Sequence, residues 1–280
     1  MQTAIMRSFP DSLALVRTGV RTGARTGART SSRAARVGAF TLETWSRLLV
    51  DGPSMGSDER ARELSWVAEN MCALHAVRLT VRGRVPSGPA LLVANHLGYF
   101  DPLIIASLLP CTAIAKADVS AWPCIGELMR RLGVMFVERE SAQSGARVLR
   151  ETLRHLTDGV SVLVFPEGTT TTGETVLPFK RGSFGAATLA GVPIVPVAIH
   201  YECASMAWVG DATFLPHYLR TITKPYTRVT VDFLDPLPRA GSAEALAEQA
   251  RRAIVEVRAK QGLAEARCVP RFADVSVATA

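Results

Sequence analysis

Residues 90–102 read Ala-Leu-Leu-Val-Ala-Asn-His-Leu-Gly-Tyr-Phe-Asp-Pro, and this stretch decides the class of the fold. Its first five residues form an unbroken apolar run, which is typical of a short strand covered on both faces of a sheet. Asp101 before Pro102 is a helix-start signal, with the acid at the N-cap and proline at the first helical position. A strand that passes through a polar loop into a helix predicts an α/β protein, with the loop at the end of the strand.

The same alternation continues along the chain in both directions. Strands are predicted over residues 77–81, 112–115, 134–137, 160–165, 194–201 and 229–233, and helices over residues 103–109, 127–132, 145–157, 183–190 and 243–260. Strands that alternate with helices indicate a largely parallel central sheet flanked by helices. We therefore expect a single α/β domain over residues 77–265, followed by a tail at residues 266–280.

The first 76 residues have a different character. Residues 17–30 repeat Arg-Thr-Gly, and glycine with β-branched threonine weakens a helix, so residues 1–37 are expected to be a disordered basic segment. Residues 40–50 and 58–75 carry apolar side chains at helical spacing. We assign residues 38–76 as amphipathic membrane-associating helices, and the alternative is that both helices cap the core.

Charge and composition narrow the set of partners. The chain has 280 residues, of which 48% are hydrophobic, and its net charge is +7. A basic balance favours nucleic acid, an anionic membrane face or phosphorylated substrates. No apolar run reaches the roughly 18 residues of a spanning helix, and no signal-peptide profile is present, so we expect the protein to stay in the cytoplasm. The five cysteines lack a Cys-x-x-Cys pair and predict neither a disulfide framework nor a zinc site.

His96 and Asp101 are the first candidates for chemistry. Taken locally, the structural alternatives are a hydrogen-bonded core histidine for His96 and a helix N-cap for Asp101. Across a strand–loop–helix turn, however, the carboxylate can hold one imidazole nitrogen while the other faces a substrate. No Gly-x-Ser-x-Gly elbow or partner cysteine accompanies the pair. A base without a protein nucleophile suggests direct deprotonation of a substrate hydroxyl, and so group transfer without a covalent enzyme intermediate.

Three further stretches carry polar side chains at element ends. Residues 165–170, Phe-Pro-Glu-Gly-Thr-Thr, follow a buried strand and read either as a turn or as a projecting carboxylate. Residues 180–183, Lys-Arg-Gly-Ser, place cations before a helix, where they are solvated or accompany a bound anion. Residues 133–139 end a strand in Glu-Arg, which is a surface pair or a fork suited to phosphate.

Together these stretches resemble the glycerolipid acyltransferase family, in which 1-acyl-glycerol-3-phosphate acyltransferases are found. His96 to Asp101 matches the family's His-x4-Asp motif, residues 133–139 its second block, residues 165–169 its third, and residues 192–197, Val-Pro-Ile-Val-Pro-Val, its fourth. The likeness covers roughly residues 77–235, and four blocks in order make it specific.

The resemblance implies a reaction in which an acyl chain passes from a thioester, on coenzyme A or acyl carrier protein, to the hydroxyl of a lysolipid. It implies His96 as general base and Asp101 as its orienter. It also implies an acceptor site that includes Arg139, Glu167, Gly168 and Thr169, to which we add the cations Lys180 and Arg181. No metal or further cofactor is implied, and backbone N–H groups are expected to stabilise the oxyanion. The partners expected are the lysolipid, the acyl donor and an anionic membrane surface, without nucleic acid, so the protein is expected peripherally on the cytoplasmic face of the inner membrane.

One departure from the family pattern concerns the acceptor. Phosphatidic-acid-forming members often have arginine where this chain has Thr170, and residues 170–179 and 207–211 look more like the lyso-ornithine-lipid branch. The acceptor is therefore expected to be 1-acyl-glycerol-3-phosphate, with lyso-ornithine lipid or another lysophospholipid as the alternative. A non-catalytic basic lipid-binding protein is the alternative of another class, and a lipase-like hydrolase is disfavoured because no serine nucleophile motif is present.

Overall fold

The computed structural model describes residues 12–138, 140–210, 213–238 and 240–268. The helices are α1 (Ser12–Val50), α2 (Ser57–Leu74), α3 (Asp101–Ala106), α4 (Ile125–Arg131), α5 (Ala142–Thr157), α6 (Gly182–Ala190), α7 (Phe214–Thr223) and α8 (Ala243–Cys268). The strands are β1 (Val77–Gly83), β2 (Leu91–Ala94), β3 (Cys111–Lys116), β4 (Met135–Val137), β5 (Ser161–Val164), β6 (Ile194–Tyr201) and β7 (Thr227–Phe233). Short 3-10 turns are η1 (Gly52–Ser54), η2 (Ala117–Ala121) and η3 (Ala204–Met206). This order confirms the predicted α/β class.

The seven strands form one sheet in the order β1-β7-β6-β2-β5-β3-β4. Neighbouring strands are parallel except β6 and β7, which are antiparallel. The central strands β2 and β5 are buried at every residue, because their largely apolar sequences are suited to a sheet covered on both faces. Since β2, β5 and β6 run in parallel, the loops that follow them meet at one edge of the sheet, where binding sites of open α/β folds are found.

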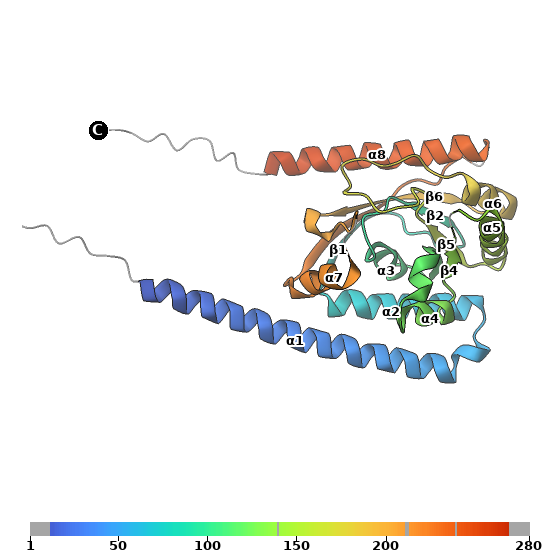
Figure 1. Cartoon of the computed structure of the whole chain (residues 1–280). Helices are drawn as coiled ribbons and strands as arrows, with labels where there is room; N and C mark the ends of the chain where they lie inside the picture. Colours follow the sequence, from blue (N-terminus) through green and yellow to red (C-terminus); the bar gives the residue numbers. More distant parts are fainter. Residues whose placement is uncertain (1–11, 139, 211–212, 239, 269–280) are drawn as a thin grey trace, which may run out of the picture.

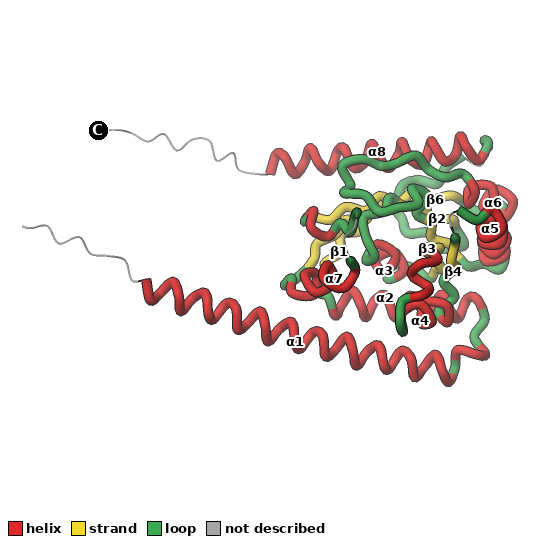
Figure 2. The backbone as a smooth tube through the Cα atoms, in the orientation of Figure 1, coloured by secondary structure: helices red, strands yellow, loops and turns green. Residues whose placement is uncertain are grey.

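Helices cover the sheet in two layers, with α2 and α3 on one face and α5, α6 and α8 on the other (Figures 1 and 2). The alternation of side chains along β2 divides the core accordingly. Leu92 and Ala94 pack in the cluster that contains Leu64 of α2, whereas Leu91 and Val93 pack with Phe184 of α6. The catalytic candidates at the end of β2 are therefore held between two packed layers.

The N-terminal segment differs from the prediction. One helix, α1, occupies residues 12–50, where disorder was expected through residue 37, and residues 1–11 lie outside the described part. Its second half is fixed by tertiary contacts: Phe40 and Leu48 are buried, and the rings of Phe40 and Trp66 lie 5.2 Å apart. Such packing outweighs the helix cost of glycine, about 1 kcal/mol per residue, which sequence propensity alone cannot judge.

The two expected amphipathic helices have different surroundings. In α2, Leu64 and Val67 are buried in the core, as the capping alternative required. In α1, by contrast, Leu42 and Val50 have exposed fractions of 72% and 76%, so this helix keeps apolar side chains at the surface. None of the helices in the described ranges is long and apolar enough to cross a bilayer.

Helix α7 was not predicted from the sequence. Its apolar residues follow helical spacing, but Pro216 is its third residue and reads as a helix breaker. In the first turn of a helix, however, the backbone N–H has no intrahelical acceptor, so proline is tolerated there. This helix lies beside α1 and close to the loop that follows β2 (Figure 1).

Candidate active site

The loop between β2 and α3 brings His96 and Asp101 together. The imidazole Nδ1 lies 2.8 Å from Asp101 Oδ2. Because a carboxylate only accepts hydrogen bonds, Nδ1 must carry the proton, and Nε2 therefore presents its lone pair. No described residue hydrogen-bonds to Nε2, and the imidazole side chain retains 19% of its exposure. The pair has the geometry of a general base and its orienting carboxylate.

Asp101 is completely buried and accepts four hydrogen bonds. Besides His96, the backbone N–H groups of Leu97 and Gly98 donate to Oδ2 at 2.5 and 2.9 Å. The Tyr201 hydroxyl donates to Oδ1 at 2.7 Å. Buried polar atoms need hydrogen-bond partners, and these donors satisfy both carboxylate oxygens and fix their orientation toward the imidazole.

The expectation that Asp101 caps α3 is wrong in detail. The helix begins at Asp101 itself, with Phe100 at the N-cap position, and Pro102 is its second residue. The Asp101 carboxylate points back to the N–H groups of the preceding loop instead of the first turn of the helix. The reason is that these N–H groups and the imidazole surround the carboxylate where it is buried, which local sequence signals do not reveal.

The ring of Phe165 stacks on one face of the His96 imidazole. The two rings are stacked, with centroids 4.1 Å apart and planes at 20°. Phe165 follows β5, and β5 is the direct neighbour of β2 in the sheet. Residues 165–169, the third sequence block, therefore contact the loop that carries His96 through the part-buried ring of Phe165.

Glu167 braces the loops around His96. Its Oε1 accepts from the N–H of His96 at 2.8 Å, and its Oε2 accepts from the N–H of Leu177 at 2.9 Å. The side chain is buried, and burial raises the pKa of this carboxyl. Both oxygens are thus occupied by backbone donors, and the residue joins the loop that carries His96 to the segment around Leu177.

Gly168 and Lys180 lie against each other in the same region. Gly168 has φ +73°, and a Cβ at this position would lie 3.1 Å from the Lys180 Nζ. The backbone N–H of Lys180 donates to Pro166 O at 2.9 Å, which fixes the lysine beside the third block. Thr169 is exposed next to them. The Lys180 ammonium therefore lies beside the loop that contains Glu167.

The remaining predicted residues are not brought into this centre. Arg181 forms an ion pair with Glu244 of α8, and its side chain is 69% exposed. Arg139 lies outside the described residues. Thr170, the predicted departure from the family pattern, donates through Oγ1 to Trp208 O and joins two loops.

Two residues that sequence reasoning missed complete the support. Tyr201 ends β6 and binds Asp101, while Arg258 of α8 donates to the carbonyl oxygens of Ile199 and Gly173. Tyr201 is the last residue of the strand predicted over residues 194–201, so a hydroxyl at a strand end was a usable signal. Arg258 carried no signal, because its partners are backbone oxygens far away in the sequence.

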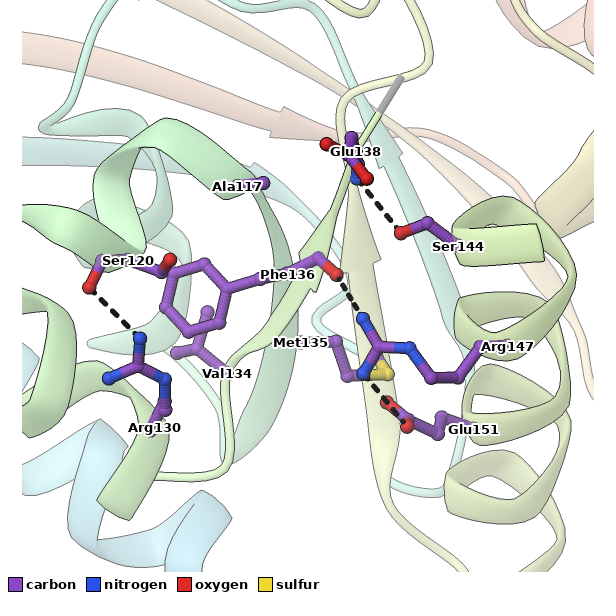
Figure 3. A pocket seen from close by; sticks show the side chains of 10 residues that line it. All are labelled: Ala117, Ser120, Arg130, Val134, Met135, Phe136, Glu138, Ser144, Arg147 and Glu151. Atoms are coloured by element: carbon purple, nitrogen blue, oxygen red, sulfur yellow. Dashed lines mark hydrogen bonds and ion pairs between the residues drawn. The ribbon is translucent and has the colours of Figure 1, made fainter. Parts of the chain in front are cut away.

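A cavity of about 530 Å³ lies beside the edge strand β4, between η2 and α5 (Figure 3). Arg147 donates to Phe136 O at 3.0 Å, and Arg130 donates to Ser120 O at 3.0 Å. Strand β4 is three strands from β2, or about 14 Å at the usual strand spacing. The cavity therefore lies outside the His96 centre. Its lining residues are Ala117, Ser120, Arg130, Val134, Met135, Phe136, Glu138, Ser144, Arg147 and Glu151.

Comparison with known proteins gives three findings. Residues 77–200 match the profile of the family described as Acyltransferase. A lyso-ornithine lipid O-acyltransferase of Pseudomonas aeruginosa is 36% identical over 202 residues, which cover 70% of this chain and 78% of the relative. A 1-acyl-sn-glycerol-3-phosphate acyltransferase of Neisseria meningitidis is 27% identical, covering 71% of this chain and 82% of the relative.

A solved structure has the same fold. The 1-acyl-sn-glycerophosphate (LPA) acyltransferase of Thermotoga maritima matches with a TM-score of 0.56 and 23% identity, over 84% of this chain and 98% of that chain. At this level of identity, the likeness bears on architecture alone.

Proposed function

The chain belongs to the acyltransferase family, and from that premise we propose that it moves a fatty acyl chain from an acyl thioester to the free hydroxyl of a lysolipid. The observation that carries the mechanism is the His96–Asp101 pair, whose Nδ1···Oδ2 distance is 2.8 Å. The family assignment bears out the resemblance of the four sequence blocks and argues against a non-catalytic lipid-binding protein.

In the proposed reaction, His96 Nε2 accepts the proton of the lysolipid hydroxyl as the oxygen attacks the thioester carbonyl. The carbon–sulfur bond then breaks, the ester is formed, and the imidazolium returns its proton to the departing thiolate. Asp101 orients the imidazole and stabilises its cationic form. The step uses groups of this chain and the acyl thioester, without a protein nucleophile.

Glu167 and the third block prepare the site in this scheme. By binding the His96 backbone N–H at 2.8 Å, Glu167 sets the position of the imidazole against the acceptor. Gly168 leaves room for the Lys180 ammonium, which supplies a positive charge for an acidic head group. We propose Lys180 as the acceptor contact, together with Gly168, Thr169 and Arg139 of the sequence blocks.

The acceptor we favour is 1-acyl-glycerol-3-phosphate, giving phosphatidic acid. The relative from Neisseria meningitidis, named for that substrate, supports it, as does the Lys180 cation. Lyso-ornithine lipid is the second candidate, because the relative from Pseudomonas aeruginosa is named for it and Thr170 replaces the usual arginine.

The lipid substrate also bears on where the enzyme acts. A lysolipid is taken from a bilayer, so we propose peripheral attachment to the anionic cytoplasmic face of the membrane. The exposed Leu42 and Val50 of α1 and the arginine-rich residues 17–36 support this attachment. The acyl donor is proposed to be acyl coenzyme A or acyl carrier protein.

The test compares wild-type protein with the variants His96→Ala and Arg84→Ala. Arg84 is an exposed control residue that directly follows β1, an outermost strand of the sheet. Each protein is incubated with an acyl thioester and, separately, with lysophosphatidic acid, lyso-ornithine lipid and lysophosphatidylglycerol. Products are identified by mass spectrometry. Loss of a general base lowers the rate by about 10²–10⁴-fold.

We expect His96→Ala to lose at least about a hundredfold in acyl transfer, whereas Arg84→Ala keeps the wild-type rate. The accepted lysolipid identifies the acceptor directly. Undiminished transfer by His96→Ala would refute the mechanism, and absence of transfer to every lysolipid by the wild type would refute the substrate class.

A further inference from the structure

Helix α7 exposes two leucines, Leu215 and Leu219, on one face. Leu215 has an exposed fraction of 61% and Leu219 of 51%. They are four residues apart, so their side chains are neighbours on the helix surface. Phe214 and Tyr218, by contrast, are stacked with centroids 5.5 Å apart and lie half-buried. The helix therefore has an inner aromatic face and an outer aliphatic face.

The inner face of α7 is attached to the catalytic loop. The Phe214 ring lies 5.0 Å from the ring of Tyr99, which is one of the residues between His96 and Asp101. The Tyr99 hydroxyl also lies 2.9 Å from Nδ1 of His217. In addition, the N–H of Trp208 donates to Leu97 O at 2.8 Å. A surface that orients α7 thus orients the loop that holds the base.

Basic residues lie on α7 and directly after it. Residues 213–228 contain no aspartate or glutamate and include Arg220, Lys224 and Arg228, of which Arg228 pairs with Glu202. Arg33 of α1 donates to the backbone oxygens of Ile222 and Lys224 at 2.9 and 2.6 Å, so α1 and α7 are joined at this end. Residues 17–36 of α1 carry six arginines and no acid. The two helices lie on the side of the sheet away from α5, α6 and α8 (Figures 1 and 2).

We propose that the outer face of α7, through Leu215 and Leu219, inserts into an anionic lipid bilayer and holds the catalytic loop at the membrane surface. The inference rests on the proposed function, since it supplies the route by which a bilayer lipid reaches His96. Two leucines beside aromatic rings and cations match an interfacial helix. They are too small a patch for a stable protein interface, which buries at least about 1,000 Å².

The test uses the double variant Leu215→Asp/Leu219→Asp in the full chain. The matched control is Leu189→Asp, because Leu189 of α6 is 78% exposed but lies in the opposite layer. Binding is measured by sedimentation with vesicles of phosphatidylglycerol and phosphatidylcholine in equal parts. Acyl transfer is measured with lysolipid in those vesicles and with a short-chain lysophosphatidic acid dissolved as monomers.

We expect the double variant to bind vesicles at least about tenfold more weakly, because the two leucines, each about half exposed, together lose roughly the burial of one whole leucine. Its transfer to vesicle lysolipid falls in parallel, while transfer to the dissolved acceptor stays at the wild-type rate. Leu189→Asp behaves as wild type. The milder variant Leu215→Ala/Leu219→Ala lies between, and circular dichroism establishes that each variant is folded.

If the double variant binds vesicles and acylates vesicle lysolipid as well as the wild type does, the proposal is overturned. The same holds if the wild type dimerises without lipid, the aspartates dissolve the dimer, and vesicle binding is unchanged, since a second copy would then cover this face. If the wild type acylates neither form of lysolipid, the proposed function fails, whereas the vesicle-binding comparison still decides the role of α7.

Discussion

Tyr201→Phe removes one hydroxyl from the buried network behind the catalytic base. In the wild type this hydroxyl donates to Asp101 Oδ1 at 2.7 Å, while the other carboxylate oxygen binds His96. Tyr201 is 7% exposed, and burial together with the neighbouring Asp101 raises its pKa well above the usual range, so it remains a donor. Phenylalanine keeps the ring in the core and leaves Oδ1 without this partner.

The magnitude follows from the hydrogen bond that is lost. A hydrogen bond to an ionised group contributes about 1.5–3 kcal/mol, and about 1.36 kcal/mol of barrier corresponds to a tenfold change in rate. The full loss would thus slow the reaction by roughly 10- to 150-fold. We expect kcat to fall about tenfold, the lower end of this range, because Oδ2 keeps its three donors. KM should stay constant, since Tyr201 contacts Asp101 and no part of the substrate site.

The assay measures kcat and KM for acyl transfer, with thermal unfolding recorded in parallel. With one donor removed, the Asp101 carboxylate is held less firmly behind the imidazole, so kcat falls while KM is unchanged. A role in packing alone would lower the unfolding temperature and leave kcat at the wild-type value. An unchanged kcat would refute the reasoning that Tyr201 positions the Asp101–His96 pair.

Two further predictions test the surroundings of the base. Glu167→Gln places an amide N–H₂ against one of the two backbone donors that the carboxylate now binds, so we expect kcat to fall about tenfold or more with near-wild-type circular dichroism; an unaffected kcat would contradict the bracing role. Burial lowers the pKa of His75 and of His155 in the folded protein. As the pH falls below about 6.5, the two imidazoles are therefore protonated in the unfolded chain before they are protonated in the folded one. The free energy of unfolding is thus at its full value above about pH 6.5 and decreases below it. Urea unfolding between about pH 7.5 and pH 5.5 should show a smaller loss for His155→Gln than for wild type, and equal losses would count against this linkage.

Much of the fold was predictable because the central strands are locally distinctive. The strands β2, β5 and β6 are mostly apolar, and such strands require cover on both faces, which the alternating helices supply. The parts that were mispredicted depend on distant contacts. The helix α1 is held through Arg33 and Phe40 by partners far along the chain, and α7 has a proline whose effect depends on its position in the first turn.

The candidate site divides in the same way. The sequence determined the family, because a histidine and an acid five residues apart at a strand end are followed by three further blocks, and the same pattern predicts the base and its partner. The tertiary structure decided which side chains serve that base. It bound Glu167 to two backbone N–H groups, paired Arg181 with Glu244, and brought Tyr201 to Asp101 across a sequence separation of 100 residues. Hydrogen bonds to backbone groups and to buried carboxylates carry no pattern along the chain, because their geometry exists only once the parallel strands have placed the loops at one edge of the sheet.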